Sequence, residues 1–189
     1  MSNSKQNITI LAEIAVFAAL SMLLALIPLD IGASFGINLG QVALTIFAIR
    51  RGAKPALLAG FIWGLLYFVI GKVWFLTLFQ VLLEYPVAFT LAGLAGVYSK
   101  PIKAALNGSG NLNKALLIGT LWGIIPRYLI HFIAGFLFWG QYAQWGMGPV
   151  LFSAVANGTD AILTAVAVYL AIRLITLPNS KTTQNLLIP

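Results

Sequence analysis

Long apolar runs separated by short polar turns limit what this sequence can fold into more than any other feature. About six such runs occur, at residues 8–27, 37–49, 55–71, 73–98, 115–140 and 149–176. A helix needs about 20 apolar residues to cross the hydrocarbon core of a bilayer. The pattern therefore predicts an all-α membrane protein, a six-transmembrane-helix bundle. The run 37–49 is short for a crossing and is expected to be tilted, half-buried or extended by the preceding IGASFG.

The composition supports a membrane protein and excludes several other classes. Hydrophobic residues form 60% of the chain and charged residues 8%, with a mean hydropathy of +0.96. We expect residues 1–189 to form a single integral membrane domain. Because the chain has no cysteine, disulfides and thiolate metal sites are excluded. The net charge of +7 comes from basic residues scattered between apolar runs, which indicates loop charges rather than nucleic-acid binding.

The distribution of the basic residues predicts the orientation of the chain. Eight basic residues lie near the chain ends or in loops on one side of the membrane. The loops on the other side carry only Asp30 and Lys72 as charged residues, and the segment GQYAQWGMG on that side has no charge. Cytoplasmic loops are enriched in Lys and Arg, so both termini are expected to be cytoplasmic. A cleaved signal peptide is not expected, because the first run is long and no small-residue cleavage site follows. The basic residues that share the cytoplasmic side are Lys5, Arg50, Arg51, Lys54, Lys100, Lys103, Lys114 and Lys181.

Three predicted helices each carry a polar side chain at a similar depth below the outer surface. With a rise of about 1.5 Å per residue, Glu84 lies about 16 Å deep and His131 and Asn157 about 13 Å deep. Trp63 reaches a comparable depth, and Tyr85 adjoins the carboxylate. Each alone has an ordinary explanation, as a helix-to-helix hydrogen bond, a packing residue or an interfacial anchor. Because intramembrane ionisable groups normally face the bundle interior or a water-filled cavity, their convergence predicts a binding cavity.

Helical spacing in the last two runs supports the same cavity. Residues spaced by three or four lie on one face of a helix, and each run has such a face formed by polar, small or aromatic side chains. Arg127 and Asp160 lie deeper and are nearly the only other charges within the membrane. We favour an ion pair between them over direct contact with a ligand. The two faces comprise Arg127, His131, Gly135 and Trp139, and Ser153, Asn157, Asp160 and Thr164.

The sequence offers little for catalysis. One histidine and scattered carboxylates do not form a metal-ligand set, so we expect neither a metal site nor enzymatic activity. The segment GLLYFVIGKV, at 64–73, has glycines seven apart and Val after its Lys, so it is not a phosphate-binding loop and the chain has no ATPase of its own. A carboxylate, an imidazole, an amide and aromatic rings suit a small, flat, partly cationic solute, because ring faces attract cations by about 0.5–2 kcal/mol per contact.

Several segments carry a resemblance to a known family. They are AEIAVFAALSMLLALIPLDIG, RRGAKPALLAGFIWGLLYFVIGK, LEY at 83–85, H-x3-G-x3-W at 131–139 and NG at 157–158. In order and spacing they resemble the thiamine-specific substrate-binding (S) component of energy-coupling factor transporters, over nearly the whole chain. The resemblance implies a six-helix protein of the bacterial plasma membrane that holds thiamine near its outer face, without a cofactor. The ligand-binding residues it implies are Trp63, Glu84, Tyr85, His131, Gly135, Trp139 and Asn157.

The resemblance also implies partners, namely a transmembrane coupling subunit and two cytoplasmic ATPase subunits. Ala15 and Ala19 form a small-xxx-small pattern in the first run, widened by Ala12 and Ala18, that lets another helix approach closely. From the residues alone, packing against the protein's own helices is the favoured use. In the family, such a pattern is the docking surface for the coupling subunit.

Three aromatic positions depart from the family pattern. Phe152 replaces an expected Tyr, Phe35 replaces a more usual Trp, and Trp74 stands where a Tyr would be unsurprising. They leave open an S component for a thiamine precursor or another vitamin. A self-sufficient secondary transporter that uses Asp160 or Glu84 as a proton site is a further alternative. The uncharged outer segments IGASFG and GQYAQWGMG, which contain Ser34 and Gln144, are expected to open and close over the pocket.

Overall fold

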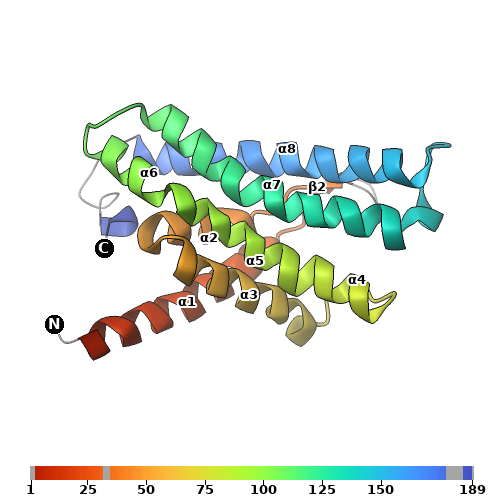
Figure 1. The fold of residues 1–189 in the computed structure, drawn as a ribbon, viewed down its shortest axis with the longest axis horizontal. Coiled ribbons are helices and arrows are strands. Elements are labelled where there is room, and N and C mark those ends of the chain that lie inside the picture. Colours follow the sequence, from red (N-terminus) through yellow and green to blue (C-terminus); the bar gives the residue numbers. More distant parts are fainter. Residues whose placement is uncertain (1–2, 32–34, 178–184, 189) are drawn as a thin grey trace.

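The computed structural model describes residues 3–31, 35–177 and 185–188, which form a bundle of helices (Figure 1). Five helical stretches are long and apolar enough to cross a membrane. Four of them correspond to α1 (Asn3–Ala25), α3 (Ala53–Ile70), α7 (Leu112–Phe138) and α8 (Pro149–Thr176), and the fifth is the composite helix 78–106. Helices α7 and α8 pack side by side along their length, joined by a turn that contains the 3-10 segment Gly140–Tyr142.

The second predicted run is helical but too short to be a sixth full span. Helix α2 (Gly40–Arg51) has 12 residues, about 18 Å of helix, against about 30 Å of hydrocarbon core. The residues before it form a two-stranded antiparallel hairpin, β1 (Asp30–Ile31) and β2 (Phe35–Gly36). These residues therefore do not extend α2 at its N-terminus. Most of α2 is buried by neighbouring helices. Ser34 lies outside the described residues.

The fourth predicted run, 73–98, has different boundaries in the structure. It begins at Leu78, where the Thr77 side chain caps the helix by accepting the Gln80 backbone N–H at 3.1 Å, and continues to Leu106. Because Pro86 has no N–H to donate, the helix widens there, and the Ala88 N–H reaches back to the Leu83 carbonyl. The composite helix consists of α4 (Leu78–Leu82), a π-helical turn (Leu83–Val87), α5 (Ala88–Ala92), a 3-10 segment (Gly93–Tyr98) and α6 (Ser99–Leu106).

Helix α3 lies against the composite helix with backbone in contact with backbone. A Cβ added at Gly64 would lie 2.5 Å from the Tyr85 carbonyl oxygen, and one at Gly60 would lie 2.2 Å from that of Phe89. Small residues allow such close approach of helices in membranes. The sequence G-x3-G at 60–64 thus fixes the position of α3 relative to the π-helical turn. The outer end of α3 stops at Gly71, whose φ of 74° is the left-handed conformation that glycine adopts most readily.

The end of the bundle that holds the N-terminus of α1 also holds the C-terminal residues (Figure 1). Glu13 of α1 forms ion pairs there with Arg50 and Arg51 at the end of α2. Arg50 also donates to the Asn185 and Leu186 carbonyls at 2.6 and 3.2 Å. The neighbouring Leu187 is completely buried in an apolar cluster of α2, α6, α7 and α8. This end is therefore closed by charge pairs and by the last described residues.

The alanine pattern of α1 is divided between two faces. Ala15 and Ala19 are exposed, as is Ala12, whereas Ala18 is completely buried in the core. Ala18 is therefore not part of the smooth outer surface that we expected, because it lies on the face that packs against α2 and α3. Within the described residues, the side chains of Ala15 and Ala19 stay exposed, so packing of these two alanines against the protein's own helices is not observed.

Candidate functional site

A cavity of about 920 Å³ is lined by residues from the end of the bundle away from Arg50 and the N-terminus of α1. Its walls come from the β-hairpin, α3, the composite helix, α7 and α8. At its mouth lie Trp74 of the α3–α4 loop and Tyr142 and Gln144 of the α7–α8 turn. Six of the seven ligand-binding residues expected from the sequence line this cavity: Glu84, Tyr85, His131, Gly135, Trp139 and Asn157.

Glu84 is held in place by hydrogen bonds to both carboxylate oxygens. The Trp139 indole N–H donates to Oε1 at 2.7 Å, and the Gln80 side-chain amide donates to Oε2. Glu84 belongs to the π-helical turn that Pro86 produces, and such turns occur frequently at functional sites. Within the described residues it has no cationic partner. A half-buried carboxylate of this kind favours a cation or a strong hydrogen-bond donor in the cavity.

Aromatic rings form the wall beside this carboxylate. Tyr85 packs against Tyr67 and Phe89, with ring centroids 5.3 and 6.2 Å apart. Its hydroxyl accepts the Trp74 backbone N–H at 2.9 Å. The His131 ring meets Phe89 edge-on at 6.0 Å. The resulting surface presents several ring faces and edges, which suit a flat aromatic solute.

Close approach of α7 and α8 forms another wall. A Cβ at Gly135 would lie 2.2 Å from the Ser153 Oγ, so a side chain there would displace the Ser153 hydroxyl. Ser153 donates to the Phe132 carbonyl at 2.7 Å, and the Asn157 amide donates to Ser153 O and Oγ, both at 3.1 Å. Within the described residues the Asn157 carbonyl oxygen has no partner. That oxygen is available to a donor in the cavity.

Trp63 is the one expected ligand residue that does not line the cavity. It is completely buried one layer behind the wall, edge-on to Phe89 at 4.5 Å and 5.1 Å from the Arg127 guanidinium. Its indole nitrogen is buried and has no hydrogen-bond partner in the part of the chain that the structure describes. A direct contact between Trp63 and a ligand stays a prediction.

The favoured ion pair between Arg127 and Asp160 is wrong. Arg127 donates to the Gln41 side-chain carbonyl at 3.0 Å and lies 4.4 Å from the centre of the Phe89 ring. Asp160 accepts the backbone N–H of Gly36 at 2.8 Å instead. The Asp160 carboxylate on α8 therefore receives its hydrogen bond from the β-hairpin. The Arg127 guanidinium instead interacts with the Gln41 amide and with aromatic ring faces. Both side chains line the cavity.

A polar network on the hairpin side was missed by sequence reasoning. The Asn38 amide donates to the Tyr67 hydroxyl at 3.3 Å, and its backbone N–H donates to Thr164 Oγ1 at 3.2 Å. Tyr128 and Thr164 share a hydrogen bond of 2.9 Å between their hydroxyls. Thr164 lies on the predicted polar face of the last run. No regular spacing marks Asn38, because it precedes α2.

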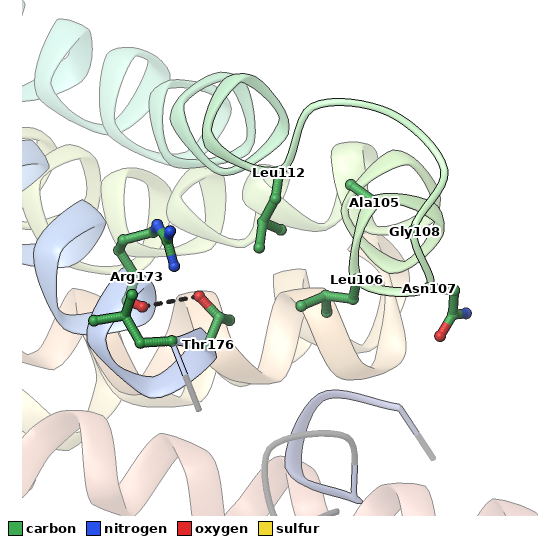
Figure 2. Close-up of a pocket in the computed structure, with 8 residues that line it drawn as sticks. Ala105, Leu106, Asn107, Gly108, Leu112, Arg173 and Thr176 are labelled. Carbon is green, nitrogen blue, oxygen red and sulfur yellow. Dashed lines mark hydrogen bonds between the residues drawn. The ribbon is translucent and has the colours of Figure 1, made fainter. Parts of the chain in front are cut away.

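A second hollow, of about 600 Å³, lies at the opposite end of the bundle (Figure 2). Among the described residues that line it, Arg173 is the one charged side chain, and the Thr176 hydroxyl donates to the Arg173 backbone carbonyl at 2.9 Å. None of the expected ligand residues lies there. Its other lining residues are Ala105, Leu106, Asn107, Gly108, Leu112 and Leu177.

Comparison with known proteins identifies the family. The profile of the family described as thiamine transporter protein matches residues 11–184. The chain belongs to this family. It is 39% identical over 172 residues to the thiamine transporter ThiT of Lacticaseibacillus paracasei, covering 88% of this chain and 85% of the relative. It is 28% identical over 164 residues to ThiT of Bacillus subtilis, covering 84% and 85%.

The fold is also that of a solved relative. The structure of ThiT from Listeria monocytogenes matches with a TM-score of 0.91 at 39% identity, covering 97% of this chain and 100% of that one. These similarities confirm the family resemblance drawn from the sequence and the all-α fold. The chain is a multi-pass membrane protein of a bacterial transporter family and not an enzyme.

Proposed function

We propose that this protein captures thiamine in the cavity around Glu84 and is the S component of an energy-coupling factor importer. The observation that carries the proposal is the Glu84 carboxylate, which is held by two donors and has no cationic partner within the described residues. Thiamine supplies both groups that such a carboxylate attracts, a permanently charged thiazolium ring and an exocyclic amine on its pyrimidine ring. The aromatic wall offers ring faces to the same cation.

The size and polarity of the cavity support a small-molecule ligand. Its volume of about 920 Å³ falls within the range of about 300–1,000 Å³ that is usual for such sites. Asn157 and His131 offer hydrogen bonds on the α7 and α8 side, while Phe152 of α8 contributes apolar surface. Phe152 has no hydroxyl, so an S component for a thiamine precursor or another vitamin is the alternative.

A binding experiment with a matched pair of glutamate variants tests the ligand and the site. Glu84→Gln keeps the side-chain shape and removes the charge, and its affinity for thiamine should fall by about 2–5 kcal/mol, the range for breaking a buried charge pair. Glu13→Gln removes a carboxylate at the opposite end of the bundle and should bind thiamine as the wild type does. Calorimetry with thiamine and a panel of other vitamins provides the measurement. Unchanged binding by Glu84→Gln would refute the assigned site.

The coupling subunit is proposed to dock on the exposed alanine face of α1, with both termini in the cytoplasm. Ala15 and Ala19 are exposed and lie two and six residues after Glu13, which pairs with Arg50 and Arg51. The basic residues of this end support its placement on the cytoplasmic side, and small side chains allow close helix approach. Because neither alanine lines the cavity, docking and binding should be separable by mutation.

The docking proposal is tested by replacing both alanines with tryptophan. The double variant should bind thiamine normally but fail to co-purify with a transmembrane coupling subunit and two ATPase subunits, and ATP-dependent uptake should be lost. Ile162→Trp with Val166→Trp is the matched control, because both residues are exposed on α8 at the same four-residue spacing. Wild-type uptake by the alanine variant would exclude α1 as the docking surface.

The alternative of a self-sufficient secondary transporter predicts a different result in proteoliposomes. The S-component proposal predicts no thiamine accumulation with an imposed proton gradient when this protein is present alone. Uptake should begin when the coupling subunit, the ATPases and ATP are added. Gradient-driven accumulation by the isolated protein would favour the secondary transporter.

A further inference from the structure

Gln80 is a completely buried glutamine whose side chain has all its hydrogen-bonding groups occupied. Its Oε1 accepts the Leu76 backbone N–H at 2.9 Å. Its Nε2 donates to the Trp74 carbonyl at 3.0 Å and also to Glu84 Oε2. A side-chain amide has two hydrogens to donate, so both are used. One side chain thus joins the Glu84 carboxylate to two backbone groups of the loop at the mouth of the cavity.

The same loop is tied to the site by Tyr85. The Trp74 N–H donates to the Tyr85 hydroxyl at 2.9 Å, while the Trp74 carbonyl accepts from Gln80. Trp74 itself is 74% exposed and lines the cavity. Both backbone groups of this residue are therefore anchored to the composite helix on either side of Glu84, although the side chain is free at the mouth.

Gln80 also restricts the direction in which Glu84 points. Trp139, which directly follows α7, donates to Oε1, and Gln80 donates to Oε2 from the preceding turn of the helix that carries Glu84. With one donor on each oxygen, the plane of the carboxylate is fixed. Without the Gln80 donor, the carboxylate could rotate about its Oε1 contact, and binding would have to restore its orientation.

We infer that Gln80 is a positioning residue for thiamine binding, which orients the Glu84 carboxylate and couples it to the loop 73–77. The inference rests on the proposed function, since it requires Glu84 to bind the ligand. Gln80→Met keeps the length of the side chain and removes its polar groups. Because hydrogen bonds to charged groups are among the stronger ones, the variant should bind thiamine roughly 10- to 100-fold more weakly.

A double-mutant cycle with Glu84→Gln distinguishes positioning from general support of the fold. Gln80→Met should weaken thiamine binding by the factor above in the wild-type background. In the Glu84→Gln background it should weaken binding by less than about threefold, because the carboxylate that it orients is absent. Equal factors in both backgrounds would overturn the inference and leave the proposed function intact. Normal thiamine binding by Glu84→Gln alone would instead overturn the proposed function.

Two further variants keep the test decisive. Gln80→Glu retains the shape and the acceptor for the Leu76 N–H but replaces the donor facing Glu84 with a carboxylate oxygen, so it should bind at least as weakly as Gln80→Met. Thr77→Val removes the cap of α4, which is the acceptor of the Gln80 backbone N–H, and loosens the same loop but keeps the Gln80 side chain that donates to Glu84. Hydrogen exchange of residues 73–77 should rise in Gln80→Met and Thr77→Val, whereas affinity should fall only in the former. Wild-type affinity of Gln80→Glu, or equal affinity loss in Thr77→Val, would refute the positioning role.

Discussion

Adding a single methyl group at Gly64 should disturb both the fold and the ligand site. The new Cβ would lie 2.5 Å from the Tyr85 carbonyl oxygen and 3.2 Å from the Pro86 Cα. To reach an ordinary contact of 3.4 Å, the nearer distance must increase by about 0.9 Å. Both atoms belong to backbone of packed helices, so no flexible side chain can move aside. Overpacking of this kind typically costs about 1–3 kcal/mol of folding free energy.

The displacement has a direct consequence for ligand binding, because the Tyr85 carbonyl is adjacent to Glu84. If α3 and the π-helical turn separate, Glu84 moves relative to Trp139 at the end of α7, and the 2.7 Å hydrogen bond between them lengthens. We therefore expect Gly64→Ala to lower the unfolding temperature in detergent and to weaken thiamine binding measured by calorimetry.

Gly158→Ala is the matched control for this prediction. Gly158 lies inside α8, and a Cβ there would have no neighbour within 4 Å. Because alanine favours helix by up to about 1 kcal/mol relative to glycine, the control should be as stable as the wild type or more stable. The close-contact reasoning would be refuted if Gly64→Ala were as stable as Gly158→Ala, or if both variants lost stability equally.

Three further predictions concern other parts of the molecule. Asp160→Ala leaves the Gly36 N–H without its acceptor and should lower stability by about 1–3 kcal/mol, whereas Asp160→Asn retains an acceptor and should cost less; thermal unfolding compares the two. Leu187→Ala should lower stability by about 1.5–3 kcal/mol without changing thiamine affinity, since Leu187 is buried away from the cavity; a change in affinity would contradict this. Trp139→Phe keeps the ring but removes the donor to Glu84, so calorimetry should show a loss of about 1.5–3 kcal/mol of binding free energy.

Periodicity and membrane depth were sufficient to predict that polar residues of three helices share one cavity. Glu84, His131 and Asn157 lie on different helices, and the rise per residue alone placed them at one level. The structure brings all three to one cavity. This succeeds because a helix is a regular rod, so sequence position determines depth along it. The same calculation gives no rotation about the helix axis, and it therefore did not distinguish Trp63, which lies behind the wall, from Tyr85, which lies in it.

Contacts made by irregular backbone were beyond prediction from the sequence. The partner of Asp160 is the Gly36 N–H of a two-residue strand, and hairpin geometry of this kind has no periodic signal. The π-helical turn has a partial signal in Pro86, which removes a donor inside an apolar run. Gln80 could have been found, because it lies four residues before Glu84, and residues four apart adjoin on a helix.

Helix α3 contacts both the composite helix, which carries the proposed binding residue Glu84, and α1, which carries the proposed docking face. Its inner face meets the π-helical turn at Gly64, and α1, which carries Ala15 and Ala19, packs against α3 as well. Because the core is close-packed, a shift of the backbone next to Glu84 also displaces α3. A Gly64→Ala variant that binds thiamine weakly should therefore also associate less well with a coupling subunit. Gly158→Ala, whose added Cβ meets nothing within 4 Å, should leave that association unchanged. Equal association of both variants would show that the position of α3 has no influence on the docking face.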